Sequence, residues 1–474
     1  MEIFMKRVLF VFLSLICLVL ASCGKQADGT AEKESDASVY DTEAGDTAVS
    51  ESDVGTESEN TTVSEAEKVV LGDEQFDEYL SMLSGKRVAL FSNQTGIVGD
   101  ETSAVLEGDV DTHFGLDAEG AEITYGEHIL DARIERDVNV VAIFCPEHGF
   151  RGTEDAGAAV DDSVDEKTGV PLLSLYKDEN THSPAEEDME KFDTLVVDMQ
   201  DVGLRYYTYY ISLYYLMDAC AAADKEVVIL DRPNPNGFYV DGGILKDGYQ
   251  SGVGQLPIPV VYGMTWGELA QMINGEGWLE SGKDSCKLTV IPCKNYTHQT
   301  KTSLIKNPSP NIKDMRAVYL YASTCFFENT QMSVGRGTEF PFEVFGSPYL
   351  EGNESFSFEF TPESMPGALE PPFMGETCYG VDLREVSIET IWENGVNPEY
   401  LVMAYNAYIE SGNDEYFWGE PDENGIYWID KLSGSDELRN MVEEGYSAEE
   451  IKASWQEDVE QFKELRREYL LYEE

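Results

Sequence analysis

Short apolar runs alternate with longer, partly apolar segments from about residue 69 onward. The runs at 87–91, 138–144, 194–197 and 226–230 are almost continuously apolar and rich in Val, Ile, Leu and Phe, which is typical of strands buried on both faces of a sheet. Residues 209–223, between the last two runs, are apolar on most faces and predict a buried helix. The alternation predicts a mostly parallel α/β sheet with Rossmann-like topology.

The pattern changes after about residue 300. Before that point, Thr265 and Glu268 have the spacing of a capping box at a helix start, and residues 288–291 predict a late strand. Residues 316–349 are rich in aromatics, Gly and Pro, and the last hundred residues mix amphipathic helix with aromatic strand. We therefore expect a Rossmann-like catalytic domain at 68–300 and a smaller α+β C-terminal domain at 301–474.

The N-terminus has the pattern of an export signal. Two basic residues precede an apolar run at 8–20, which is too short to span a membrane comfortably. The following Leu20-Ala21-Ser22-Cys23 resembles a bacterial lipoprotein signal, with residues 1–22 removed and Cys23 lipidated; the alternative is a plain signal peptide with an incidental Cys. Residues 23–67 predict a disordered acidic tether, since positions 26–67 hold 13 acids and one base. We expect a protein exported and lipid-anchored on the extracytoplasmic face of the bacterial membrane, touching the membrane through this anchor alone.

Polar residues follow each of the four early strands. In open parallel sheets, ligands bind at the carboxyl edge of the strands. Helix caps and turns also place Asn and Asp there, but four such clusters exceed what capping requires. The sequence therefore predicts a shared site at this edge, with the candidate residues Asn93 and Thr95; Glu147, His148 and Arg151; Asp198, Gln200 and Asp201; Asp231, Arg232 and Asn234.

Glu147 is the best single catalytic candidate. It follows a buried strand directly, behind a Pro, and a carboxyl in a partly apolar cleft stays protonated as a general acid. The alternative is that Glu147 caps the next helix. Asp198 and Asp201 are its candidate catalytic partners, because carboxylates are the usual acid, base and nucleophile of glycoside hydrolysis. Two further carboxylates, Glu328 and Glu343, lie in the later part of the chain.

Basic residues are scarce in this chain, so arginines that lie within polar clusters are candidates for ligand binding. The 474 residues include 91 acids and 32 Lys and Arg, a net charge of −59, which disfavours nucleic-acid binding and attachment to anionic lipid through a basic patch. Arg forks bind carboxylates and aromatic faces stack on sugar rings, so these clusters suit an acidic sugar. The alternative is that the arginines pair with neighbouring acids. The clustered residues are Arg151, Arg205 with Tyr206, Arg232, and Arg336 with Glu328 in the same region.

Cofactor motifs are missing from the sequence. There is no G-x-G-x-x-G after the first strand and no P-loop, so neither a dinucleotide nor a nucleotide is expected. Six cysteines beyond residue 23 are scattered without zinc spacing, and five histidines make a His-rich metal site unexpected. Most of these cysteines read as buried thiols, although Cys286 and Cys293 have a spacing that allows pairing.

Four motifs recur together in one family. They are residues 146–152 (PEHGFRG), 198–209 (DMQDVGLRYYTY), 230–235 (LDRPNP) and 333–338 (SVGRGT). With them the chain resembles the bacterial exo-β-N-acetylmuramidases, long known only as a domain of unknown function. The resemblance implies release of terminal N-acetylmuramic acid from the non-reducing end of peptidoglycan-derived glycans or muropeptides. It also implies an active site in the cleft between the two domains, with Glu147 as the catalytic Glu and the lactyl carboxylate held by an Arg fork.

The sequence also departs from the family. Many members carry His where this chain has Tyr262, a residue that we expect to contact substrate. Two alternatives therefore stay open: a non-catalytic sugar- or muropeptide-binding lipoprotein, and a related hexosaminidase with altered specificity. The sequence leaves the oligomeric state undetermined.

Overall fold

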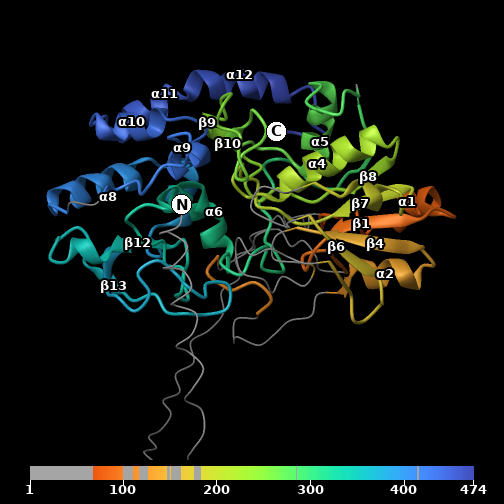
Figure 1. The fold of residues 1–474 in the computed structure, drawn as a ribbon, viewed down its shortest axis with the longest axis horizontal. Coiled ribbons are helices and arrows are strands. Elements are labelled where there is room, and N and C mark those ends of the chain that lie inside the picture. Colours follow the sequence, from red (N-terminus) through yellow and green to blue (C-terminus); the bar gives the residue numbers. More distant parts are fainter. Residues whose placement is uncertain are drawn as a thin grey trace, which may run out of the picture. The chain divides into compact units, whose positions relative to one another are not determined.

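A seven-stranded sheet forms the first part of the fold (Figure 1), in the order β11-β8-β7-β1-β4-β6-β5. The computed structural model describes residues 68–99, 110–116, 126–146, 150, 162–175, 183–283, 285–413 and 416–474, all within one compact unit, Glu65–Glu474. The pairings from β11 to β6 are parallel, and β5 is antiparallel to β6. The strands are β1 (Val88–Ser92), β4 (Val140–Cys145), β5 (Ser163–Val164), β6 (Pro171–Ser174), β7 (Thr194–Asp198), β8 (Glu226–Leu230) and β11 (Lys287–Ile291).

Helices cover both faces of this sheet, which is why the middle residues of its central strands are apolar. In β1, Val88 and Leu90 pack into one core and Ala89 and Phe91 into another, because successive side chains point to opposite faces. The first core includes α1 (Phe76–Leu83) and α2 (Ile129–Glu135), and the second includes α4 (Tyr209–Ala222) and α5 (Trp266–Gly275). The predicted parallel sheet, the buried helix at 209–223 and the capping box at the start of α5 are confirmed.

The later part combines a small antiparallel sheet with helices, as predicted for an α+β region. The sheet order is β12 (Val344–Ser347), β14 (Cys378–Asp382), β13 (Phe358–Phe360). The core that holds α4 and α5 continues into this part as far as Phe462, so the two parts share one hydrophobic core. The helices are α6 (Met315–Thr324), α7 (Ile388–Asn394), α8 (Glu399–Glu410), α9 (Trp428–Ser433), α10 (Glu437–Glu443), α11 (Ala448–Ser454) and α12 (Gln456–Arg466).

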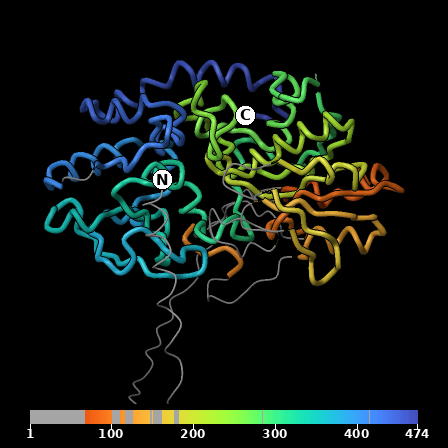
Figure 2. Tube along the Cα trace, in the orientation of Figure 1, coloured from red at the N-terminus to blue at the C-terminus, as the bar shows by residue number. Residues whose placement is uncertain are grey.

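Shorter elements complete the described part. A two-stranded pair joins β9 (Asp241–Ile244) to β10 (Pro259–Val261), and another joins β2 (Ile97–Val98) to β3 (Glu127–His128); α3 (Glu186–Met189) is a single turn. After α12 the chain returns toward the first part of the fold (Figure 2). There the backbone N–H of Leu471 donates to Glu268 of α5 at 2.8 Å. The six described cysteines are buried free thiols, Cys286 and Cys293 among them.

The predicted export segment is not part of this description. The signal at 1–22, Cys23 and the tether at 23–67 lie outside the described residues. Within the described residues, no helix has the length and apolar character needed to cross a bilayer.

Candidate active site

The carboxyl ends of β1 and β7 lie side by side in the middle of the sheet, with Ser92 in register with Asp198. The chain crosses from β1 to β4 on one side and later reaches β7 on the other, so this is the topological switch point where open α/β sheets bind ligands. Predicted residues from different strand ends do meet here, since the backbone N–H of Gln200 donates to Thr95 Oγ1 at 2.9 Å.

The loop after β4 begins at the same edge. Strand β4 pairs with β1 and ends at Cys145, followed by a buried Pro146. The three candidates on this loop, Glu147, His148 and Arg151, lie outside the described residues.

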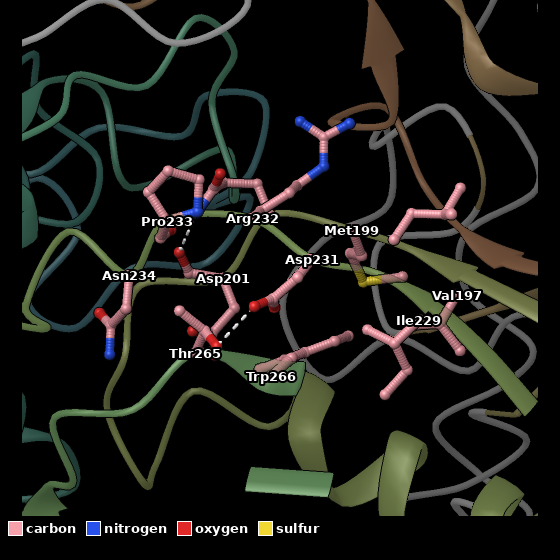
Figure 3. A pocket seen from close by; sticks show the side chains of 12 residues that line it. Val197, Met199, Asp201, Ile229, Asp231, Arg232, Pro233, Asn234, Thr265 and Trp266 are labelled. Carbon is pink, nitrogen blue, oxygen red and sulfur yellow. Dashed lines mark hydrogen bonds between the residues drawn. The ribbon is translucent and has the colours of Figure 1, made fainter. Parts of the chain in front are cut away.

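Arg232 forms a buried ion cluster at the switch point. Its Nε donates to Asp198 Oδ1 at 2.6 Å and its Nη2 donates to Asp73 Oδ2 at 2.8 Å. The Arg232 side chain is 4% exposed and both carboxylates are fully buried. Burial alone would lower the pKa of Arg232, but the two carboxylates outweigh it and raise this pKa above its ordinary value. Figure 3 shows the guanidinium pointing away from Asp231 and Thr265, so Arg232 acts within the protein's own ion cluster here.

Asp201 is a buried carboxyl held by two neighbours. Its Oδ1 accepts from the backbone N–H of Gly203 at 2.6 Å, and the Tyr262 hydroxyl lies 3.2 and 3.3 Å from its two oxygens. Burial raises the pKa of Asp201 to about 7, against the lowering effect of these hydrogen bonds. A carboxyl with this pKa can exchange a proton near neutral pH, which is the property needed for acid–base chemistry.

The Asp231 carboxylate is held by three hydrogen bonds from other parts of the fold. Its carboxylate accepts from the Thr265 hydroxyl at 2.7 Å (Figure 3), from the Gly267 backbone at 2.9 Å and from the Tyr472 hydroxyl at 2.6 Å. Burial raises its pKa to about 6. These contacts fix the start of α5 and the C-terminal segment against β8.

The asparagines at this edge are also buried. Asn234 Nδ2 donates to the Met264 carbonyl at 2.8 Å, and Asn93 Oδ1 accepts from Thr95. Asn93 Nδ2 and Asp198 Oδ2 have no hydrogen-bond partner among the described residues. The cavity at the ends of β7 and β8 measures about 10 Å³, room for roughly one water molecule (Figure 3). This part of the edge is a packed polar core with no space for a sugar.

A separate groove of about 700 Å³ is lined by residues from both parts of the fold. This volume falls in the range of small-molecule sites, ~300–1,000 Å³. Its lining brings predicted Tyr206 together with predicted Glu328 and Arg336 from the later part of the chain, and it also includes Tyr321, Trp428 and Lys431. The Tyr206 ring meets the Tyr321 ring edge-on at 5.3 Å between centroids.

Arg336 is held firmly at the groove. Its Nε donates to Glu328 Oε1 at 2.8 Å and its Cζ lies 4.9 Å from the centroid of the Phe342 ring. The side chain is 19% exposed. Among the described residues, none forms a hydrogen bond with its Nη1 or Nη2, the two atoms that could bind a carboxylate.

The backbone around Arg336 is unusual. Gly335 and Gly337 have φ of +80° and +82°, and Phe342 has φ of +69°, which is uncommon for a residue with a side chain. A Cβ on Gly337 would lie 2.5 Å from the Glu363 carbonyl oxygen. Strained backbone persists where the surroundings enforce it, and such positions cluster at ligand clamps.

Arg205 was predicted to bind the substrate, but in this structure its guanidinium binds backbone carbonyls of the protein itself. The residue is fully buried, and its guanidinium donates to the carbonyls of Gly243, Ile258 and Leu432 at 2.7, 2.6 and 2.8 Å. Burial lowers its pKa to about 10. Because Leu432 belongs to α9, Arg205 joins that helix to the first part of the fold.

Several residues at the switch point and in the groove were not predicted from the sequence. Asp73 has no motif to mark it, because its ion pair with Arg232 joins residues far apart in the chain. Trp428 and Lys431 lie in the strongly acidic C-terminal region, where one Lys among many charges is not distinctive. Within the described residues, no group of three or more His, Cys, Asp or Glu is placed to hold a metal ion.

Comparisons with known proteins agree with this architecture. Residues 88–316 match the family model described as exo-beta-N-acetylmuramidase NamZ, N-terminal, and residues 319–472 match the corresponding C-terminal model. The peptidoglycan beta-N-acetylmuramidase NamZ of Bacillus subtilis (strain 168) is 32% identical over 412 residues, covering 83% of this chain and 89% of that protein.

Two crystal structures of DUF1343 family proteins from Bacteroides fragilis NCTC 9343 share the fold. One has 48% identity and a TM-score of 0.72, covering 86% of this chain and 99% of that one; the other has 28% identity and a TM-score of 0.66, covering 85% and 99%. The fold and the matches define an enzyme of the glycosidase class. Within that class, the chain belongs to the exo-β-N-acetylmuramidase NamZ family.

Proposed function

We propose that the protein is an exo-acting hydrolase that releases terminal N-acetylmuramic acid from the non-reducing end of peptidoglycan fragments. The observation that carries this proposal is the groove of about 700 Å³ with Arg336 in its lining. N-acetylmuramic acid differs from N-acetylglucosamine by an anionic lactyl group. In a chain with a net charge of −59, a firmly held arginine at the groove is a specific means of selecting that group.

The catalytic groups are proposed from the strand ends. Glu147 follows β4, which lies beside β1 at the switch point, and we assign it the role of general acid/base. Of its two candidate partners, Asp198 is tied to Arg232, and Asp201 has a buried carboxyl with a pKa of about 7 beside a cavity that holds roughly one water molecule. We therefore assign neither carboxyl a direct contact with the sugar, and Asp201 is the one that can exchange a proton near neutral pH. Family membership supports the reaction class.

Glu147→Gln tests the catalytic assignment. The variant should keep the thermal transition of the wild type and release no N-acetylmuramic acid from a chromogenic muraminide, because an amide cannot donate the proton. Full activity in this variant overturns the role of Glu147. Wild-type protein that binds the sugar and yields no product after long incubation is instead a binding lipoprotein.

Arg336→Lys tests the substrate. Lysine keeps the charge and loses the planar fork, so kcat/KM for the muraminide should fall roughly 10- to 100-fold. Any activity on a chromogenic glucosaminide should be unchanged in this variant, because that sugar lacks the lactyl carboxylate. Equal losses on both substrates, or faster wild-type cleavage of the glucosaminide, indicate a hexosaminidase of different specificity.

We also propose that the protein is exported and anchored through lipidated Cys23, ahead of a catalytic domain at 68–300 and a C-terminal domain at 301–474. The support is the sequence at 20–23 and the acidic segment behind it. Wild-type protein expressed in bacteria should incorporate labelled palmitate and sediment with membranes. Cys23→Ala should do neither, and incorporation in that variant contradicts the anchor.

A further inference from the structure

Arg336 shares a single hydrogen bond with the acid beside it. Its Nε donates to Glu328 Oε1 at 2.8 Å, and this is the one hydrogen bond that its guanidinium makes within the described residues. Both side chains line the groove, where Arg336 is 19% exposed and Glu328 is 26% exposed. A guanidinium carries five N–H donors, so the contact leaves the four donors on Nη1 and Nη2 for a ligand.

Two other arginines of the described part bind their acids through two hydrogen bonds. Arg384 donates Nε and Nη2 to the Asp382 carboxylate, at 2.9 and 2.7 Å. Arg439 donates the same two atoms to the Asp430 carboxylate, at 2.9 and 3.3 Å. In these pairs the acid occupies a whole edge of the guanidinium, which is the usual geometry of a structural ion pair. The acid beside Arg336 instead fixes the guanidinium at one donor and leaves its Nη1–Nη2 edge unoccupied.

We propose that Glu328 is a positioning residue, which sets the plane of the Arg336 guanidinium so that its Nη1–Nη2 edge receives the carboxylate of the substrate. In this assignment Glu328 does not contact the sugar, in contrast to the substrate-binding role that its place in the sequence predicts. The inference rests on the proposed function, since it concerns the same arginine and the same anionic group.

Both partners are fixed by the structure around them. Glu328 follows the 3₁₀ turn η1 (Cys325–Phe327), and its backbone N–H donates to the first carbonyl of that turn at 3.0 Å. The Arg336 guanidinium lies against the Phe342 ring, which the Tyr321 ring meets edge-on at 4.6 Å between centroids. Donors that are ordered before the ligand arrives lose little conformational entropy on binding, so their contacts contribute more fully to affinity.

Electrostatics and positioning predict opposite effects for the loss of this acid. A carboxylate beside Arg336 repels a substrate anion, so on charge alone its removal should tighten binding of that anion. Burial lowers the pKa of Arg336, and the charge and hydrogen bond of Glu328 outweigh this effect and raise the pKa above its ordinary value. An arginine is charged at neutral pH without such help, so what Glu328 supplies is orientation. Its removal should therefore weaken binding of the carboxylate.

Calorimetry with two ligands isolates the contact with the carboxylate. The ligands are N-acetylmuramic acid and its lactyl amide, which has nearly the same shape and no charge. Wild-type protein should bind the acid at least tenfold more tightly than the amide. Glu328→Leu removes the acceptor of the Arg336 Nε–H and should reduce this preference to less than threefold. Glu328→Gln keeps an oxygen that can accept this N–H, so its preference should stay within threefold of that of wild type.

A control on the same loop separates orientation from the charge of the surface. Glu339→Gln removes an exposed acid that pairs with Lys313 at 2.8 Å, and it should leave the preference for the acid unchanged. Because the preference is a ratio of two affinities of one protein, general damage to the groove lowers both affinities and does not imitate the effect.

Three results overturn the inference. They are a Glu328→Leu variant that keeps or increases the preference, a Glu328→Gln variant whose preference falls as far as that of Glu328→Leu, and a wild-type protein that binds acid and amide equally. The proposed hydrolysis fails separately. If wild type prefers the acid but releases no N-acetylmuramic acid from a natural disaccharide, that result refutes the reaction alone, because both ligands bind without turnover.

Discussion

Buried carboxyls set the chemistry of this fold at the scale of single residues. Asp73 and Asp201 have pKa values raised to about 7 and Asp231 to about 6, in each case mainly because burial penalises the charged form. They differ in their partners. Asp73 faces Arg232, Asp231 is surrounded by donors from the fold, and Asp201 has one backbone donor and the Tyr262 hydroxyl. Among these three carboxyls, Asp201 is therefore the one whose raised pKa is set by burial and two neutral hydrogen-bond donors.

Asp201 should make stability depend on pH. Its pKa in the folded state is raised from 3.8 to about 7, so between these values the folded chain holds a proton that the unfolded chain has lost. This contribution is complete below about pH 4 and is lost as the pH rises through about 7. Asp201→Asn should reduce the fall in the free energy of unfolding between pH 4 and 7 by at least ~1 kcal/mol, as measured by urea denaturation.

A control and a second variant sharpen this measurement. Asp247→Asn, at an exposed turn, should leave the pH dependence as in wild type. Tyr262→Phe removes a hydrogen bond that lowers the pKa of Asp201, so the fall in stability should extend to higher pH. An unchanged profile in both Asp201→Asn and Tyr262→Phe would show that this carboxyl is ionised in the folded state.

Secondary structure elements were the part most accessible from the sequence. Strands β1, β7 and β8 were predicted to within about one residue, because strands buried on both faces are marked by uninterrupted apolar runs. Their carboxyl-end clusters do meet, as topology requires. The role of Arg205 was not accessible, because its carbonyl partners lie 38, 53 and 227 residues away and carbonyl groups carry no sequence signal. Motif spacing identified Arg336, but the strained loop that presents it is visible only in the backbone.

The loop that presents Arg336 yields a prediction at this scale. Gly337→Ala places a Cβ 2.5 Å from the Glu363 carbonyl, so the loop must move and kcat/KM for the muraminide should fall at least tenfold. Gly445→Ala is a matched control, because Gly445 has φ of +81° with nothing within 4 Å of the added Cβ. The control should cost only ~1–2 kcal/mol of stability, and equal activity in the two variants contradicts the role of the loop.

The whole described unit is joined by its C-terminal segment. After α12 the chain returns to the first sheet, where the Tyr472 hydroxyl donates to Asp231 Oδ2 at 2.6 Å and accepts from the backbone N–H of Cys293 at 2.9 Å. The hydrophobic core also runs through both parts. Two parts that share a core and are joined by the last residues of the chain should unfold together.

Tyr472→Phe tests this coupling. Loss of the hydroxyl leaves one fewer donor for the buried Asp231 carboxylate and removes the acceptor of the Cys293 N–H, which should cost ~2–4 kcal/mol in the free energy of unfolding. If the parts are coupled, this variant lowers the midpoint of a single transition, reported identically by near-ultraviolet circular dichroism and by activity. Tyr446→Phe, at an exposed tyrosine, should leave the midpoint within ~0.5 kcal/mol of wild type. A transition that splits in two for Tyr472→Phe, with the later part still unfolding at the wild-type midpoint, would show that the C-terminal segment stabilises only the first part.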